Sequence, residues 1–290
     1  MWEACYFLDV SSLEFLPGER AEGGKHTEGR ESSEERVTLQ ELKALLDEER
    51  LSKYQGIQNK KVAGACLGAG LLLRLAATEL KSNCQVFSEK NGAPIRDVGC
   101  CLREEKGRRK REPKGMGDDL GPLGENMRIL SPEDVLVRMR HLPVERRQAL
   151  HYRYGKNGKP YWVELPYYFS LSHSGDLVAL AVSEQEIGLD VQKVTGTDWK
   201  KLAGRFFAQE EQRELEKLCE ISEELGRKEF FRLWCQKESY GKMTGEGLLP
   251  YLQKKVTAFE NAVLLEKELE LGGNGYFFAL CKGRVNGREK

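Results

Sequence analysis

Apolar and polar residues alternate in the stretch 169–174. A period of two places successive side chains on opposite faces of an extended chain, so the pattern predicts a strand that ends in a turn at Gly175. The apolar run 177–183 predicts a second strand. His173 lies on the first of these strands, where a lone histidine is more often a structural residue than a ligand.

A third strand is predicted over residues 187–191, where three aliphatic residues alternate with smaller or polar ones. Asp190 and Gln192 share the face opposite the aliphatic one. An ordinary strand with its polar residues towards solvent has the same pattern. The strand alone therefore leaves a structural and a functional interpretation open.

A helix is predicted over residues 228–244, and a glycine follows it. Phe231, Trp234 and Glu238 fall within one stripe of this helix, with Lys242 beside it. A carboxylate on the apolar side of a helix is costly unless it is paired or bound to a metal. An intrahelical pair between Glu238 and Lys242 would explain their spacing, but it does not explain why the pair lies on the apolar side.

The first half of the chain carries a predicted strand at its start and a helix that begins at Thr38. Thr38 and Glu41 form a capping box ahead of a leucine-rich run. Arg50 and Lys53 lie near the end of this helix. They could bind an anionic ligand there or simply be solvated, and the two interpretations are equally good. The three glycines in 64–70 do not form a phosphate loop, and we expect them to let a helix pack closely.

The composition excludes several classes of protein. The chain has 290 residues with 46 basic and 46 acidic side chains, so no net positive field favours nucleic acid. Its eight cysteines lack zinc-finger spacing, as expected of reduced thiols in a cytoplasmic protein. The N-terminus lacks the features of a signal peptide. The longest apolar stretch, 62–73, is short and rich in glycine, so no membrane association is predicted.

The chain is unevenly organised. Residues 18–36 are polar and rich in glycine and glutamate, which predicts a mobile loop. The basic run 103–114 is of a kind that is usually solvated. A short helix is predicted to begin at Ser131 and Pro132, and a last strand covers 275–281.

Several of these segments together resemble the Sfp-type 4′-phosphopantetheinyl transferases. The resemblance covers roughly residues 37–80 and 150–282, and its order and spacing both fit. It rests on Ser172–Gly175, Ile187–Val191, Trp234, Lys237–Ser239 with Lys242, Arg205–Phe207 with Glu210, Gly158–Tyr161 and Leu67–Arg74.

The resemblance implies an α+β fold in which two α/β halves, each a small antiparallel sheet packed with helices, form a pseudo-dimer. The halves would be 1–165, with an insertion at about 82–150, and 166–290. Coenzyme A would bind in the cleft between them. No internal repeat is visible in the sequence, so the pseudo-symmetry comes from the resemblance alone.

The resemblance also implies the reaction, in which phosphopantetheine moves from coenzyme A to a serine of an acyl or peptidyl carrier protein. Mg²⁺, with Mn²⁺ as an alternative, would be held by Asp190 and Glu238, with Gln192 beside them. Glu238 or a metal-bound water would act as base, Lys242 would steady the phosphate charge, and His173 would contact phosphate. Residues implied to bind coenzyme A are Arg50, Lys53, Lys159, Ser172, His173 and Lys242.

Gln192 departs from the family pattern, because many members carry a second carboxylate at this position. A relative that binds coenzyme A or a carrier without turnover therefore stays open as an alternative. A different Mg²⁺-dependent enzyme, such as a pyrophosphatase, also stays open, and it would release phosphate without modifying a carrier. We expect a monomer whose partners are coenzyme A and the carrier protein.

Overall fold

The computed structural model describes residues 3–14, 38–91, 129–140, 151–155, 157–259 and 262–283. The predicted loop 18–36, the basic run 103–114 and most of the predicted insertion lie outside these residues.

The helices are α1 (Leu39–Lys43), α2 (Glu48–Gln55), α3 (Lys60–Asn91), α5 (Pro132–Arg140), α6 (Trp199–Phe206), α7 (Gln209–Ile221) and α8 (Glu223–Thr244). The strands are β1 (Glu3–Asp9), β2 (Ile129–Leu130), β3 (Tyr152–Tyr154), β4 (Pro160–Trp162), β5 (Tyr168–Ser174), β6 (Leu177–Ser183), β7 (Ile187–Lys193), β8 (Ala262–Leu271) and β9 (Asn274–Gly283).

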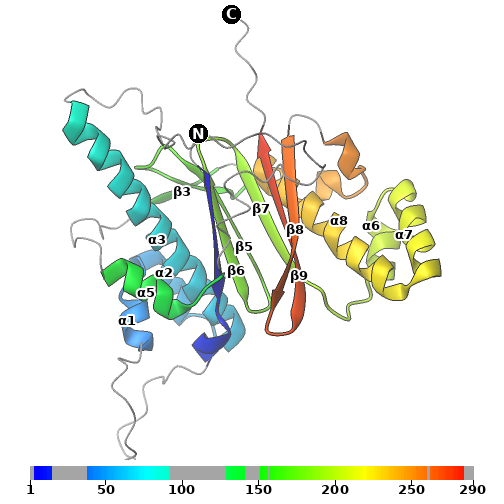
Figure 1. The fold of residues 1–290 in the computed structure, drawn as a ribbon, viewed down its shortest axis with the longest axis horizontal. Coiled ribbons are helices and arrows are strands. Elements are labelled where there is room, and N and C mark those ends of the chain that lie inside the picture. Colours follow the sequence, from blue (N-terminus) through cyan, green and yellow to red (C-terminus); the bar gives the residue numbers. More distant parts are fainter. Residues whose placement is uncertain are drawn as a thin grey trace, which may run out of the picture.

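The predicted α+β class is confirmed. Three small sheets have the strand orders β2-β1-β6-β5, β3-β4 and β7-β9-β8. They lie between α1, α2, α3 and α5 on one side and α6, α7 and α8 on the other (Figure 1). All pairings between these strands are antiparallel except that of β1 with β2.

The strands predicted in the second half are all present. β5 and β6 form a hairpin whose turn contains Gly175 at φ +55°, the left-handed region that glycine favours. β6 also pairs with β1 along seven residues. This sheet therefore draws strands from both sides of the boundary that was predicted between residues 165 and 166, and the division into two halves stays a prediction.

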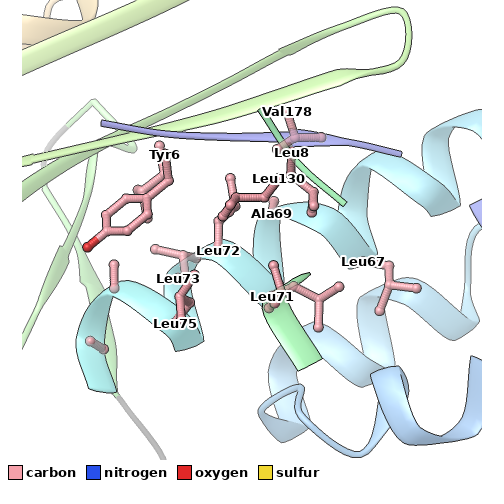
Figure 2. Packing of buried hydrophobic residues seen from close by; sticks show 14 of the residues in the cluster. Tyr6, Leu8, Leu67, Ala69, Leu71, Leu72, Leu73, Leu75, Leu130 and Val178 are labelled. Carbon is pink, nitrogen blue, oxygen red and sulfur yellow. The ribbon is translucent and has the colours of Figure 1, made fainter. Parts of the chain in front are cut away.

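Helix α3 packs against the sheet formed by β1 and β6. Its leucines at 71, 72, 73 and 75 are fully buried, and they belong to one core cluster with Tyr6, Leu8 and Val178, in which Leu72 points towards Tyr6 and Leu8 (Figure 2). A Cβ atom on Gly68 would come within 2.6 Å of the Val10 side chain, so glycine is needed for this close approach. The prediction that these glycines allow close packing is confirmed at Gly68 and also at Gly70, which faces Leu46.

The segment Lys60–Leu80 of α3 is long and apolar enough for a membrane span, and it extends beyond the stretch 62–73 seen in the sequence. However, 83% of its most apolar window is buried inside the protein. Burial against β1 and β6 accounts for its hydrophobicity as that of a core helix.

The predicted helix after Thr38 is two short helices instead of one. The capping box is present, with the Thr38 hydroxyl accepting the N–H of Glu41. The chain then leaves the helix after Lys43, and Asp47 begins α2 by accepting the N–H of Arg50 at 2.8 Å. Asp47 is itself a strong N-cap residue, and it restarts the helix at a new angle.

Helix α8 ends as predicted at Gly245, which has φ +73°. It begins at Glu223, five residues before the predicted start at 228. One side of α8 packs on α6 and α7 through a cluster of aromatic rings, in which Phe207 stacks on Phe230 at 5.2 Å between ring centroids. The other side covers β7 and β9, and this brings the predicted site residues of α8 and β7 together.

Candidate functional site

The face of β7 that carries Asp190 is covered by α8, so the solvent-facing interpretation of this strand is wrong. Asp190 is only 1% exposed. The two elements approach closely because residue 188 is glycine, where a Cβ atom would lie 1.9 Å from the carbonyl oxygen of Ser239. The polar face of β7 therefore packs against α8 and does not face solvent.

Asp190 is the centre of a compact polar network. Its Oδ1 atom accepts hydrogen bonds from the Ser172 hydroxyl at 2.6 Å and from Lys242 Nζ at 2.8 Å. Lys242 Nζ also donates to Ser172 Oγ at 3.0 Å. The three residues come from β7, β5 and α8, so the network joins three separate elements at one point.

Lys242 pairs with Asp190 and not with Glu238. Among the described residues, Glu238 makes no ion pair and no hydrogen bond, so the intrahelical interpretation of the Glu238–Lys242 spacing is wrong. Glu238 is half-buried, and burial raises the pKa of its carboxyl group. The positive charge of Lys242 lowers this pKa, and the negative charge of Asp190 raises it further.

This arrangement fits a hard divalent cation. Glu238 is a carboxylate without a bonding partner among the described residues, and a second carboxylate is close enough to affect its pKa. A cation between them would relieve both the desolvation and the repulsion. Within the described residues no group of three or more histidine, cysteine, aspartate or glutamate side chains could form a metal cage. A bound cation would therefore take its other ligands from water and from phosphate oxygens, as Mg²⁺ usually does.

Gln192 is bonded to the same carboxylate. Its Nε2 atom donates to Asp190 Oδ2 at 2.9 Å. Because the amide nitrogen makes this bond, the amide oxygen is the atom left to bind a cation or a water molecule. A glutamate at this position could not donate, and without a cation it would repel Asp190.

The strands β5 and β7 are joined by serine side chains. Where the two strands meet, serine hydroxyl oxygens of β5 accept hydrogen bonds from backbone N–H groups of β7. Every second residue on each strand takes part. The three bonds are Leu189 to Ser170 at 2.9 Å, Val191 to Ser172 at 3.3 Å and Lys193 to Ser174 at 2.9 Å. A serine hydroxyl has one donor and two acceptor positions, and Ser172 uses all of them within the site.

His173 is close enough to Lys53 and Lys242 for their charges to affect it. His173 is exposed, but the part of its ring that faces the protein is desolvated, and this lowers its pKa below the ordinary 6.5. The positive charges of Lys242 and Lys53 lower the pKa further. At neutral pH His173 is therefore an uncharged ring beside two lysines.

The two remaining predicted residues lie at the edges of this cluster. Lys159 donates to the carbonyl oxygen of Met243 at 2.7 Å and also pairs with Glu186. It lines a cleft of about 240 Å³ together with Lys242. Arg50 acts electrostatically on Tyr152 and Tyr154, and none of its contacts reaches Asp190 or Glu238.

The structure also places residues that the sequence interpretation missed. Gly188 and the serines at 170 and 174 determine how β7 meets its neighbours. The serine pattern was visible in the sequence as an alternation with the period of the strand itself. A second missed feature is a buried ion pair between Lys237 and Glu211, for which the sequence offered no clear indication.

Taken together, the half-buried Glu238, the buried Asp190 with its partly exposed partner Lys242, and the nearby basic residues would suit a divalent cation and a phosphorylated ligand. Comparison with known proteins finds a family to which this region is similar. Residues 186–281, which include Asp190, Gln192, Glu238 and Lys242, match the 4′-phosphopantetheinyl transferase superfamily. Over these residues, about a third of its length, the chain is similar to that superfamily.

Curated relatives agree with the family match. The chain is 39% identical over 95 residues to the 4′-phosphopantetheinyl transferase psf-1 of Bacillus pumilus, covering 32% of this chain and 38% of the relative. It is 32% identical over 113 residues to the 4′-phosphopantetheinyl transferase gsp of Aneurinibacillus migulanus, covering 39% and 44%. It is 39% identical over 114 residues to the 4′-phosphopantetheinyl transferase HetI of Nostoc sp., covering 37% and 46%. The chain thus spans less than half the length of each of these relatives.

Proposed function

We propose that this protein transfers 4′-phosphopantetheine from coenzyme A to a serine of an acyl or peptidyl carrier protein. One observation carries the proposal. The segment that matches the superfamily contains a half-buried glutamate that bonds to no residue in the described part of the chain and lies close to an aspartate–lysine pair. The names of the relatives support the same reaction.

The bond changes of the reaction set two requirements. The carrier serine oxygen forms a bond to the β-phosphorus of coenzyme A, and the bond from that phosphorus to the bridging oxygen breaks. The leaving group is 3′,5′-adenosine bisphosphate, which keeps the electron pair of the broken bond. The serine proton must go to a base, and the charge that develops on the phosphate oxygens must be stabilised.

Glu238 is suited to accept the proton. Its raised pKa makes it a stronger base than an ordinary surface glutamate, and no other group among the described residues occupies its oxygens. Lys242 carries the positive charge for the phosphate oxygens, and its bond to Asp190 holds its ammonium group in place.

Asp190 and Glu238, with the amide oxygen of Gln192, would hold Mg²⁺, and Mn²⁺ is an alternative. When bound, the cation would neutralise the pyrophosphate and polarise it towards attack. Lys53, His173, Lys159 and Arg50 are proposed to bind the phosphates and the nucleotide part of coenzyme A. Ser172 is proposed to contact coenzyme A as well, although its hydroxyl is already fully bonded within the site.

One observation favours a second candidate, a relative that binds coenzyme A or a carrier without turnover. Gln192 stands where the resemblance implies a second carboxylate in many members, and it donates to Asp190 Oδ2, an atom that a metal-bound water could otherwise contact. We place this candidate second, because Glu238 and Lys242 keep the family residue types.

Intact-mass spectrometry tests the proposal. Apo carrier proteins are incubated with the protein, coenzyme A and Mg²⁺, and with a chelator in the control. Carriers should gain the mass of one phosphopantetheine group only when the divalent cation is present. Unmodified carriers across acyl and peptidyl types, with coenzyme A still bound by the protein, would favour the second candidate. We further propose that the protein acts as a monomer in the cytoplasm.

A further inference from the structure

A fully buried ion pair, which the proposed reaction does not use, joins Lys237 of helix α8 to Glu211 of helix α7. Lys237 Nζ lies 2.9 Å from Glu211 Oε2, and the side chains are 0% and 2% exposed. Taking two charges out of water is costly, and an apolar pair of similar size is often as stable. A pair of this kind therefore calls for an explanation beyond stability.

The pair connects three segments of the chain. Lys237 Nζ also donates to the backbone carbonyls of Tyr251, at 3.4 Å, and of Lys254. Glu211 accepts the backbone N–H of Val256 at 3.2 Å and that of Ala208 at 3.3 Å. Together these bonds tie the middle of α8 to the start of α7 and to the segment that follows α8.

The face of α8 that carries Lys237 lies next to the face that carries the site. Residues four positions apart lie on one face of a helix. Lys237 and Gly241 thus share one face, and Gly241 packs so tightly against Gly247 that a Cβ atom would lie 2.4 Å from its carbonyl oxygen. Glu238 and Lys242 share the adjacent face, where Lys242 meets Asp190. Because a helix rotates as a unit, bonds on the first face set the position of the second.

We propose that the Lys237–Glu211 pair is a positioning element that sets the rotation of α8 and so holds Glu238 in reach of Asp190 for metal binding. Its consequence for turnover rests on the proposed function, but its consequence for metal binding does not. Lys237 and Glu211 touch neither the carboxylates nor the ammonium of the site, so they act only through the helix.

Four variants separate positioning from simple support of the fold. Glu211→Gln keeps the size and the acceptor for Val256 but removes the charge. Lys237→Met removes the ammonium, and Lys237→Met with Glu211→Met removes both charges and leaves neither buried alone. The control is Lys255→Met with Glu214→Met, because this exposed pair joins the same helix α7 to the same following segment at 3.3 Å.

The readouts are the unfolding temperature, the affinity for Mn²⁺ and the rate of carrier modification. Mn²⁺ is titrated into the protein without coenzyme A and followed by the loss of the free-ion paramagnetic resonance signal. In the double methionine variant the unfolding temperature should fall, because the backbone groups bonded by the pair lose their partners, so binding and turnover are measured well below that temperature. Its Mn²⁺ affinity should fall at least about fivefold, and kcat at least about tenfold, since small misplacements of reacting groups have large effects. Glu211→Gln should also lower the Mn²⁺ affinity and kcat, and the control pair should change neither of these two.

The inference is overturned if the double variant, or Glu211→Gln where the double variant does not fold, binds Mn²⁺ and turns over like wild type. It is also overturned if the control pair has an equal effect, or if wild type binds no Mn²⁺. If wild type binds Mn²⁺ but modifies no carrier, the proposed function fails while the Mn²⁺ affinities still decide the role of the pair.

Discussion

Gly188 is not itself a site residue, but adding a single methyl group at this position should abolish the function of the site. In Gly188→Ala the new Cβ would lie 1.9 Å from the Ser239 carbonyl oxygen and 2.3 Å from the Met243 nitrogen. Ordinary contact begins at 3.4 Å, so going from 1.9 Å to 3.4 Å requires a shift of about 1.5 Å. Both neighbours are backbone atoms of α8, which cannot rotate away as a side chain can.

The shift must therefore move α8 away from β7. The bond from Lys242 Nζ to Asp190 Oδ1, now 2.8 Å, would lengthen beyond hydrogen-bonding distance. Overpacking of this kind costs about 1–3 kcal/mol of stability, and a displacement of about 1 Å can lower a catalytic rate about a hundredfold. We expect a lower unfolding temperature and a loss of carrier modification on that scale.

The matched control is Gly204→Ala on α6, where a Cβ atom would meet no atom of the described residues within 4 Å. This substitution should stabilise the protein by up to about 1 kcal/mol, since alanine favours a helix over glycine, and should leave the rate unchanged. Thermal unfolding and intact-mass rate measurements on both variants check the prediction. A Gly188→Ala protein that modifies carriers at the wild-type rate would refute the idea that close α8–β7 contact holds the site together.

Four further predictions concern the site itself. Glu238→Gln should slow carrier modification at least about a hundredfold. Because the folded-state pKa of Glu238 is raised, its charge disfavours the fold above the ordinary pKa of 4.5. The metal-free variant should therefore unfold at a higher temperature than wild type at pH 7 and at the same temperature near pH 4; a lower temperature at pH 7 would contradict this. Asp190→Asn keeps the packing but loses the charge, so it should abolish modification while the circular dichroism spectrum stays native; normal turnover with Mg²⁺ would exclude Asp190 as a ligand. Gln192→Glu should keep activity, and Mg²⁺ should raise its unfolding temperature more than that of wild type, because the added carboxylate repels Asp190 until a cation is bound; an equal rise in both proteins speaks against a cation at Gln192. The lowered pKa of His173 means that wild type loses stability as the pH falls below 6.5, and His173→Gln should lose less; identical pH profiles of unfolding would show that His173 is not desolvated.

The sequence was most informative where side-chain periodicity reports directly on structure. The three strands from Tyr168 to Lys193 and the end of α8 at Gly245 are found where the alternation and the glycine predicted them. The capping box at Thr38 is likewise present. These features depend on residues close together in the chain, and such interactions leave a local pattern.

The sequence was least informative about contacts between distant segments. The alternation in β7 does not reveal that α8 covers its polar face, so the strand alone left open whether Asp190 faces solvent, and the structure shows that it is buried. The spacing of Glu238 and Lys242 suggested a pair within the helix, but Lys242 turns to Asp190, more than fifty residues earlier in the chain. The break between α1 and α2 was missed because the leucine pattern continues through it while Asp47 restarts the helix.

The proposed transfer is tested most directly by counting both products in one reaction. Apo carrier, coenzyme A, Mg²⁺ and the protein are incubated, and modified carrier and 3′,5′-adenosine bisphosphate are quantified by mass spectrometry at several times. Transfer predicts that the two products appear in a one-to-one ratio, and that both are lost in Glu238→Gln. Nucleotide released without modified carrier would identify a hydrolase, and neither product in the presence of bound coenzyme A would identify a relative that binds without turnover.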